Sequence, residues 1–79
     1  MDREVIEQRF ASAGWKIDRS FSEYLIIGYN GNGPSILAYP EAGETVDPVF
    51  ELLDHESNLT YRVQEILPPQ RAAQLLQEH

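Results

Sequence analysis

The sequence has no cysteine among its 79 residues. Neither a disulfide nor a thiolate zinc site can therefore stabilise the fold, and a chain this small then depends on a continuous apolar core. Hydrophobic residues make up 42% of the chain, which is enough for such a core and too many for a disordered chain. We expect a single domain over residues 1–79 with modest stability.

Long apolar runs are also missing. The longest, residues 24–27, is far shorter than the roughly 18 residues that a membrane-spanning helix needs. The first residues of the chain are charged and contain no apolar signal-peptide core. We therefore expect a soluble, cytoplasmic protein that does not bind membranes.

Positive charge is absent from the middle of the chain. No lysine or arginine occurs between Ser20 and Tyr61, and the net charge of the chain is -7. Nucleic-acid binding is disfavoured, because phosphate contacts need a basic surface. A basic protein partner and simple solubility both explain an acidic surface. The acids of this span are Glu23, Glu41, Glu44, Asp47, Glu51, Asp54 and Glu56.

An amphipathic helix is expected at each end of the chain. Asp2 can cap the first helix, in which Ile6, Phe10 and Ala13 form one apolar stripe. Gly14 is well placed to end it. After two prolines at positions 68 and 69, residues 70–77 are expected to form the last helix.

The segments between the helices have the alternation typical of strands. We expect an α+β fold of order α-β-β-β-β-α, in which an antiparallel meander of three or four strands packs one face against both helices. The strand-like stretches are residues 15–18, 23–29, 35–39, 49–54 and 59–66.

The last two strand-like stretches flank a four-residue connection, residues 55–58, which is a common hairpin length. If Asp54 lies opposite Leu59, then Glu51 faces Arg62, and the apolar side chains fall on the other side of the hairpin. The remaining expected pairs are Leu52 with Tyr61 and Phe50 with Val63.

The stretch YNGNGPS, residues 29–35, repeats Asn-Gly. A phosphate-binding loop needs a following helix and usually a lysine, whereas Asn-Gly between apolar runs favours a hairpin turn. A tight turn on Asn30-Gly31 pairs Leu25 with Ile36, and one on Asn32-Gly33 pairs Tyr29 with Ile36. Either turn places Leu25, Ile27, Tyr29, Ile36 and Ala38 on one face, and Tyr24, Ile26, Leu37 and Tyr39 on the other.

Two short helices can cover one face of this hairpin but hardly both. We therefore expect the second face to be a partner or self-association surface; the alternative is that loops or two-sided burial cover it. Trp15 is expected to pack in the core or at the sheet edge. The proposed surface consists of Tyr24, Ile26, Leu37 and Tyr39.

No residue pattern indicates catalysis or a cofactor. There is no cysteine nucleophile, and no serine has a recognisable partner, since His55 would have to reach it across the fold. Divalent-cation ligands could come from Asp47, Asp54 and Glu56, although a solvated turn explains the same acids.

The segments "SAGW", "LAYPEAG" and "VFELLDHESNLTYRVQEILPPQRAAQLLQEH" resemble short uncharacterised proteins of cyanobacteria. The resemblance implies a cytoplasmic, non-catalytic protein and no particular site residue. Together with the composition, it favours a small protein-interaction or regulatory module that is not an enzyme. The alternative is a small ligand-binding protein, with a divalent cation held at the acidic loop.

Overall fold

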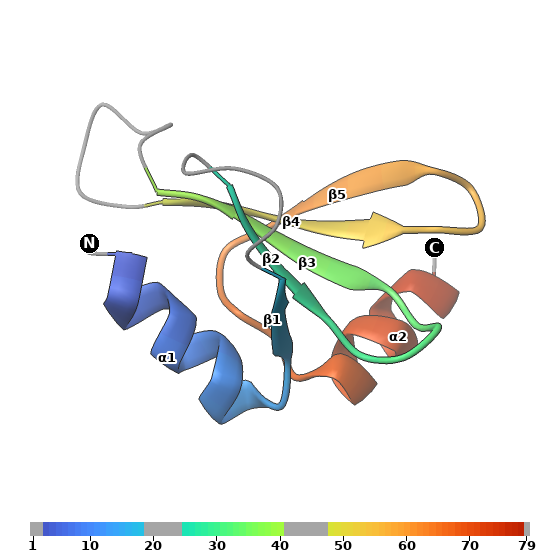
Figure 1. Ribbon diagram of the computed structural model, residues 1–79. Helices are drawn as coiled ribbons and strands as arrows, with labels where there is room; N and C mark the ends of the chain where they lie inside the picture. The colour runs from blue at the N-terminus through green and yellow to red at the C-terminus, as the bar shows by residue number, and fades with distance from the viewer. Residues whose placement is uncertain (1–2, 19–24, 41–47, 79) are drawn as a thin grey trace.

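The computed structural model describes residues 3–18, 25–40 and 48–78. Two helices, α1 (Arg3–Ala13) and α2 (Pro69–Gln77), precede and follow along the chain a single antiparallel sheet (Figure 1). Its strands follow chain order, β1-β2-β3-β4-β5, so the sheet is a meander. They are β1 (Lys16–Asp18), β2 (Ile26–Tyr29), β3 (Ser35–Tyr39), β4 (Val49–Asp54) and β5 (Leu59–Val63).

The α+β meander expected from the sequence is therefore confirmed, but the expected number of strands was too low. The sheet has five strands rather than three or four. All five strand-like stretches of the sequence form strands, and the first, β1, pairs with β2 so that Ile17 lies opposite Gly28. A stretch of three residues is too short to show alternation clearly, yet it extends the sheet because β2 offers a free edge for pairing.

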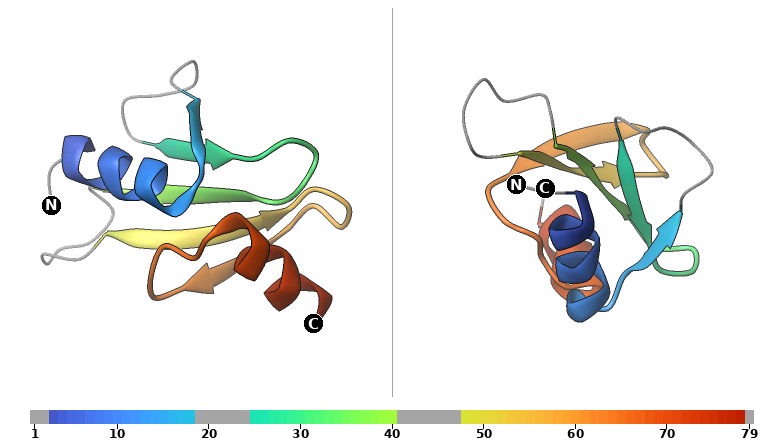
Figure 2. Two further views of the ribbon diagram at one scale, coloured as in Figure 1. Left: turned by 90° about the horizontal axis from the view of Figure 1, so that it is seen from below. Right: turned by 60° about the vertical axis from the view of Figure 1, so that its left-hand side comes forward.

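Both helices pack on the same face of the sheet, as expected (Figures 1 and 2). The apolar stripe of α1 buries Ile6 and Phe10 completely, and α2 buries Ala72. Helix α1 contacts β1 and β2. The rest of the core comprises Trp15, which precedes β1, and the residues on the face of the sheet beneath the helices, Ile26, Ile36, Ala38, Phe50 and Leu52.

A hydrogen bond joins the two ends of the domain. Helix α1 ends at Gly14, whose φ of 107° suits a residue without a side chain. The chain then turns so that Trp15 is only 3% exposed, which confirms that it belongs to the core. Its indole Nε1 donates to the carbonyl oxygen of Leu67 over 2.7 Å. The end of α1 is thereby joined to the segment that leads into α2.

The β4–β5 hairpin has the predicted register. Asp54 lies opposite Leu59, and Glu51 opposite Arg62. A connection of fixed length and a strict alternation of apolar residues were enough to determine the pairing. The other predicted pairs, Leu52 with Tyr61 and Phe50 with Val63, also form.

The β2–β3 hairpin has the opposite parity to the one predicted. Gly28, not Leu25 or Tyr29, lies opposite Ile36. The N–H of Gly33 donates to the carbonyl of Asn30 over 3.2 Å, and Gly31 has a φ of 59°. A turn therefore forms at the Asn-Gly repeat, but the connection between the paired strands has an odd number of residues. This exchanges the faces of β2 relative to β3.

Gly28 allows α1 to approach β2 closely. A Cβ atom at this position would come within 2.9 Å of both Ile36 Cγ2 and Phe10 Cδ2. The missing side chain thus leaves room for the buried ring of Phe10.

Replacing Gly28 with alanine should destabilise the protein by about 1–3 kcal/mol, because the added methyl group overpacks the core. The matched control is Gly33→Ala, whose Cβ would meet only the Asn30 carbonyl oxygen at 3.4 Å; we expect it to change the free energy of unfolding by less than about 0.5 kcal/mol. Urea denaturation followed by the fluorescence of the single tryptophan measures both. Equal stabilities of the two variants would contradict this packing.

The indole N–H of Trp15 should exchange with solvent as slowly as the most protected backbone amides. Its bond to Leu67 opens only when the N-terminal and C-terminal segments separate, which requires extensive unfolding. Native-state hydrogen exchange by NMR follows this proton, because the chain has one tryptophan and thus one indole N–H signal. Exchange at the rate of a free indole would show that the bond does not join the two ends.

Candidate functional site

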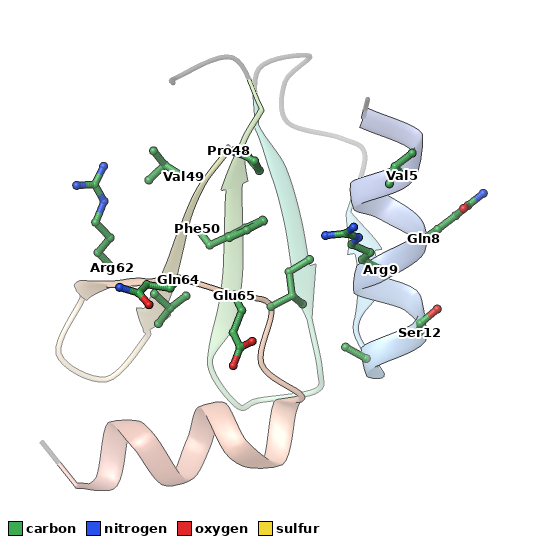
Figure 3. A pocket seen from close by; sticks show the side chains of 13 residues that line it. Val5, Gln8, Arg9, Ser12, Pro48, Val49, Phe50, Arg62, Gln64 and Glu65 are labelled. Atoms are coloured by element: carbon green, nitrogen blue, oxygen red, sulfur yellow. The ribbon is translucent and has the colours of Figure 1, made fainter. Parts of the chain in front are cut away.

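A groove lies between α1 and the strands β4 and β5, and we call it the α1–β5 groove. It has a volume of about 1080 Å³. Figure 3 shows α1 as one wall, with the sheet and the segment after β5 opposite it. The apolar lining is Val5, Ala13, Pro48, Val49, Phe50, Val63 and Ile66, and the polar lining is Gln8, Arg9, Ser12, Arg62, Gln64 and Glu65.

The floor of the groove is the margin of the hydrophobic core. Phe50 is 7% exposed and packs against Phe10, with the ring centroids 6.5 Å apart and the planes at 49°. Next to it, Val63 is only partly buried. Val5 on α1 is 39% exposed, because it lies beside the buried stripe and no strand covers it. The groove therefore combines an apolar floor with an uncovered apolar wall.

The charge of the groove differs from that of the chain as a whole. Arg9, Arg62 and Glu65 are its charged lining residues in a chain of net charge -7; Arg62 lies on the outer face of the sheet, opposite Glu51, and extends away from α1 in Figure 3. In Figure 3, Arg9 extends from α1 toward Phe50, whereas Glu65 points toward α2. Ion pairs within the described ranges join Arg3 to Glu7 and Arg71 to Glu78; neither groove arginine has a carboxylate partner among these residues.

The partner surface predicted on the hairpin is not formed as expected. Ile26 is fully buried in the core, and Leu37 lies on the opposite face of the sheet with an exposure of 7%. The cause is the odd connection of the β2–β3 hairpin, which turns Ile26 inward and places Ile27 beside Leu37. Tyr24 lies outside the described residues.

The fourth residue of that surface, Tyr39, is half-buried at the end of β3. Burial raises the pKa of its phenol above the ordinary value, and the negative charge of Glu51, to which the phenol donates a hydrogen bond, raises this pKa further. Glu51 also lies opposite Arg62 in the β4–β5 ladder. Tyr39 is thus engaged with the neighbouring strand and is not an open aromatic anchor.

Asp54, one of the acids proposed as cation ligands, accepts hydrogen bonds from the turn that follows it. Asp54 Oδ1 accepts the backbone N–H of Glu56 over 3.1 Å, and Oδ2 accepts the Ser57 hydroxyl over 2.8 Å. Both carboxylate oxygens therefore stabilise the turn after β4. Asp47 lies outside the described residues, and the residues within the described ranges contain no group of three metal-ligating side chains.

One pair of residues was missed at the sequence level. Ser35, only 5% exposed, shares a hydrogen bond of 2.7 Å with Nε2 of His55. Ser35 lies opposite Leu53 in the β3–β4 ladder, and His55 follows two positions later, on the same face. The expectation that no serine has a histidine partner was therefore wrong. The signal that could have revealed this pair is the β3–β4 register.

The Ser35–His55 pair has the residue types of a nucleophile and its base, but among the described residues no printed contact supplies a third group that orients the histidine. A nucleophile must reach its substrate, and its base needs a third group that orients it. Ser35 is almost inaccessible, and the neighbouring carboxylate of Asp54 is occupied by Glu56 and Ser57. The bond instead ties the start of β3 to the turn after β4.

No protein-family model, curated protein or solved structure matches this chain. The resemblance to short cyanobacterial proteins thus stays a prediction from the sequence. Neither α1 nor α2, the helices in the described part of the chain, has the length and apolar character of a membrane-spanning helix.

His55→Ala should lower the free energy of unfolding by about 1–3 kcal/mol, because the buried hydroxyl of Ser35 loses its partner. Ser35→Ala should cost less, since the exposed His55 ring can bond to water. In the double variant the two losses should therefore be less than additive. Urea denaturation of the four proteins measures this coupling, and strict additivity would show that the two side chains do not stabilise one another.

Proposed function

We propose that this protein is a non-catalytic protein-interaction module of the cytoplasm, and that it binds an acidic, partly apolar segment of another protein in the α1–β5 groove. The observation that carries the proposal is Arg9, which extends over an apolar floor without a carboxylate partner among the described residues. A partner that supplies a carboxylate would satisfy the guanidinium while its apolar side chains cover the floor.

The character of the lining supports a protein partner. Interfaces combine an apolar, desolvated centre with a polar rim, and arginine is enriched in them. Here Phe50 and Val63 form the centre, whereas Gln8, Arg62 and Gln64 belong to the rim. Because the rest of the chain is acidic, this groove is also where an acidic partner meets the least repulsion.

A small ligand-binding protein is the second candidate, since a groove of about 1080 Å³ is also large enough for a small amphipathic anion. A divalent cation bound by Asp47, Asp54 and Glu56 is a less well supported ligand, because the carboxylate of Asp54 already accepts two hydrogen bonds. NMR titrations with laurate and with calcium separate these alternatives. Saturable shifts of groove residues by laurate alone, with no bound peptide, would favour the small ligand.

The test of the proposed function is peptide selection followed by charge reversal. A random displayed peptide library selected on the intact protein should return sequences rich in Asp or Glu with interspersed apolar residues. Arg9→Glu should weaken the selected peptides at least tenfold, which corresponds to about 1.4 kcal/mol of binding free energy. Isothermal titration calorimetry measures this loss.

The matched control is Arg71→Glu, which makes the same change of charge on α2 outside the groove. It should alter the affinity less than twofold. If the library returns no binder, or if Arg9→Glu and Arg71→Glu weaken binding equally, the groove is not the binding surface.

A further inference from the structure

The connection between β2 and β3 contains two asparagines that each precede a glycine, Asn30-Gly31 and Asn32-Gly33. An asparagine before glycine is chemically labile, because the glycine nitrogen can attack the side-chain amide and no Cβ atom of the glycine obstructs the ring that forms. All four residues are exposed. Sequence and exposure alone therefore do not distinguish the two asparagines.

One hydrogen bond of the turn distinguishes them. The N–H of Gly33 donates to the carbonyl oxygen of Asn30 over 3.2 Å. Gly31, the first central residue of this turn, has a φ of 59°, as a type II′ turn requires. Among the described residues, the N–H of Gly31 takes part in no hydrogen bond. The nitrogen that can attack Asn30 is thus uncommitted, whereas the nitrogen that can attack Asn32 is bonded.

The same hydrogen bond activates the peptide group between Asn30 and Gly31. The Asn30 carbonyl and the Gly31 N–H belong to this one group, so a donor at the carbonyl oxygen draws electron density from the nitrogen. The Gly31 N–H then loses its proton to hydroxide more easily. The N–H of Gly33, by contrast, must first break its own hydrogen bond, which costs free energy. Both effects favour reaction at Asn30.

The surroundings of Gly31 leave room for the ring to close. A Cβ atom at Gly31 would meet no atom within 4 Å, whereas one at Gly33 would lie 3.4 Å from the Asn30 carbonyl oxygen. The side chain of Asn30 is itself exposed, so it can rotate toward the Gly31 nitrogen without displacing a neighbour.

We infer that Asn30 is the preferred site of spontaneous deamidation in the folded protein, and that it reacts through a cyclic imide formed with Gly31. Hydroxide removes the Gly31 amide proton, and the nitrogen then forms a bond to Cγ of Asn30. The bond from Cγ to the side-chain nitrogen breaks, and this nitrogen takes a proton from water and leaves as ammonia. Water then opens the imide at either of its two carbonyl carbons.

The two products of this opening have different effects on the turn. Each adds one carboxylate to a chain whose net charge is already -7. Opening at Cγ gives aspartate, in which the main-chain carbonyl at position 30 keeps its donor, Gly33. Opening at the main-chain carbon gives isoaspartate, in which this carbonyl becomes the free carboxylate and the backbone runs through Cγ. The isoaspartyl product therefore loses the turn bond and has a connection one carbon atom longer.

Incubation of the full protein at mildly alkaline pH tests the inference. Peptide mapping by mass spectrometry with electron-transfer fragmentation locates each converted asparagine and distinguishes aspartate from isoaspartate. Asn30 should convert faster than Asn32 in the folded protein. The ratio of the two rates should be about two- to tenfold higher than in the same protein unfolded in guanidinium chloride, because that is the effect of one hydrogen bond of ordinary strength.

An equal rate ratio in the folded and unfolded protein would show that the turn selects neither site, and faster conversion of Asn32 in the folded protein would show that it selects the other one. Either result overturns the inference. So does the absence of product from the folded protein under conditions that convert the unfolded chain.

Asn30→Gln and Asn32→Gln are the matched variants. A glutamine must close a six-membered ring, which forms far more slowly. Asn30→Gln should therefore remove most of the acidic product that anion-exchange chromatography separates, whereas Asn32→Gln should leave most of it. The reverse result would assign the reaction to Asn32.

Hydrogen exchange by NMR supplies a readout that does not depend on deamidation. Exchange also begins with removal of the amide proton by hydroxide, so it measures the first step directly. The Gly31 amide should exchange faster than the Gly33 amide, whose proton is held in the turn bond. Equal or greater protection of Gly31 would contradict the proposed basis of the selectivity.

Discussion

The hydrogen bond from the Trp15 indole to the Leu67 carbonyl determines how the two ends of the chain meet. It joins the residue that follows α1 to the segment that precedes α2, across 52 positions of sequence. Gly14 lies at the same junction, where a Cβ atom would be in ordinary van der Waals contact with the Pro69 ring at 3.5 Å. The C-terminal end of α1 and the N-terminal end of α2 are thereby held close together, and both helices lie on the same face of the sheet (Figure 2).

The α1–β5 groove follows from this arrangement and from simple dimensions. Helices of 11 and 9 residues are about 16 and 13 Å long, and strands spaced about 4.8 Å apart make a five-stranded sheet about 19 Å wide. Helix α1 covers β1 and β2. The part of β4 and β5 that α2 does not reach therefore has no helix above it. The core is continuous beneath both helices, and its margin at Phe50 becomes the floor of an open site.

The features that the sequence predicts correctly depend on residues close together in the chain. The stripe of Ile6 and Phe10, the end of α1 at Gly14 and the β4–β5 register each need only a local pattern. The β2–β3 register was wrong because two Asn-Gly pairs compete within one short connection, and neither forms the tight turn that the pattern predicts. Core packing of Ile26 and Phe10 decides between the registers, and that information is tertiary.

The functional features were the hardest to predict for the same reason. The Ser35–His55 bond depends on the β3–β4 register, whose intervening connection carries no strong turn signal. The groove brings Arg9 of α1 near Phe50 of β4, and no spacing rule predicts that these two residues lie close together. The pattern of each strand predicts which of its faces is apolar, but it does not show which part of that apolar face the helices leave uncovered.

The parity of the β2–β3 connection has a consequence for the lengths that this chain can tolerate there. Side chains in a strand alternate strictly, so adding or removing a single residue in the segment 30–34 would exchange the inner and outer faces of β2. Ile26 would then leave the core, and Gly28 would no longer lie beneath Phe10. A change of two residues preserves the faces. Among relatives of this chain, insertions in the turn should therefore come in pairs.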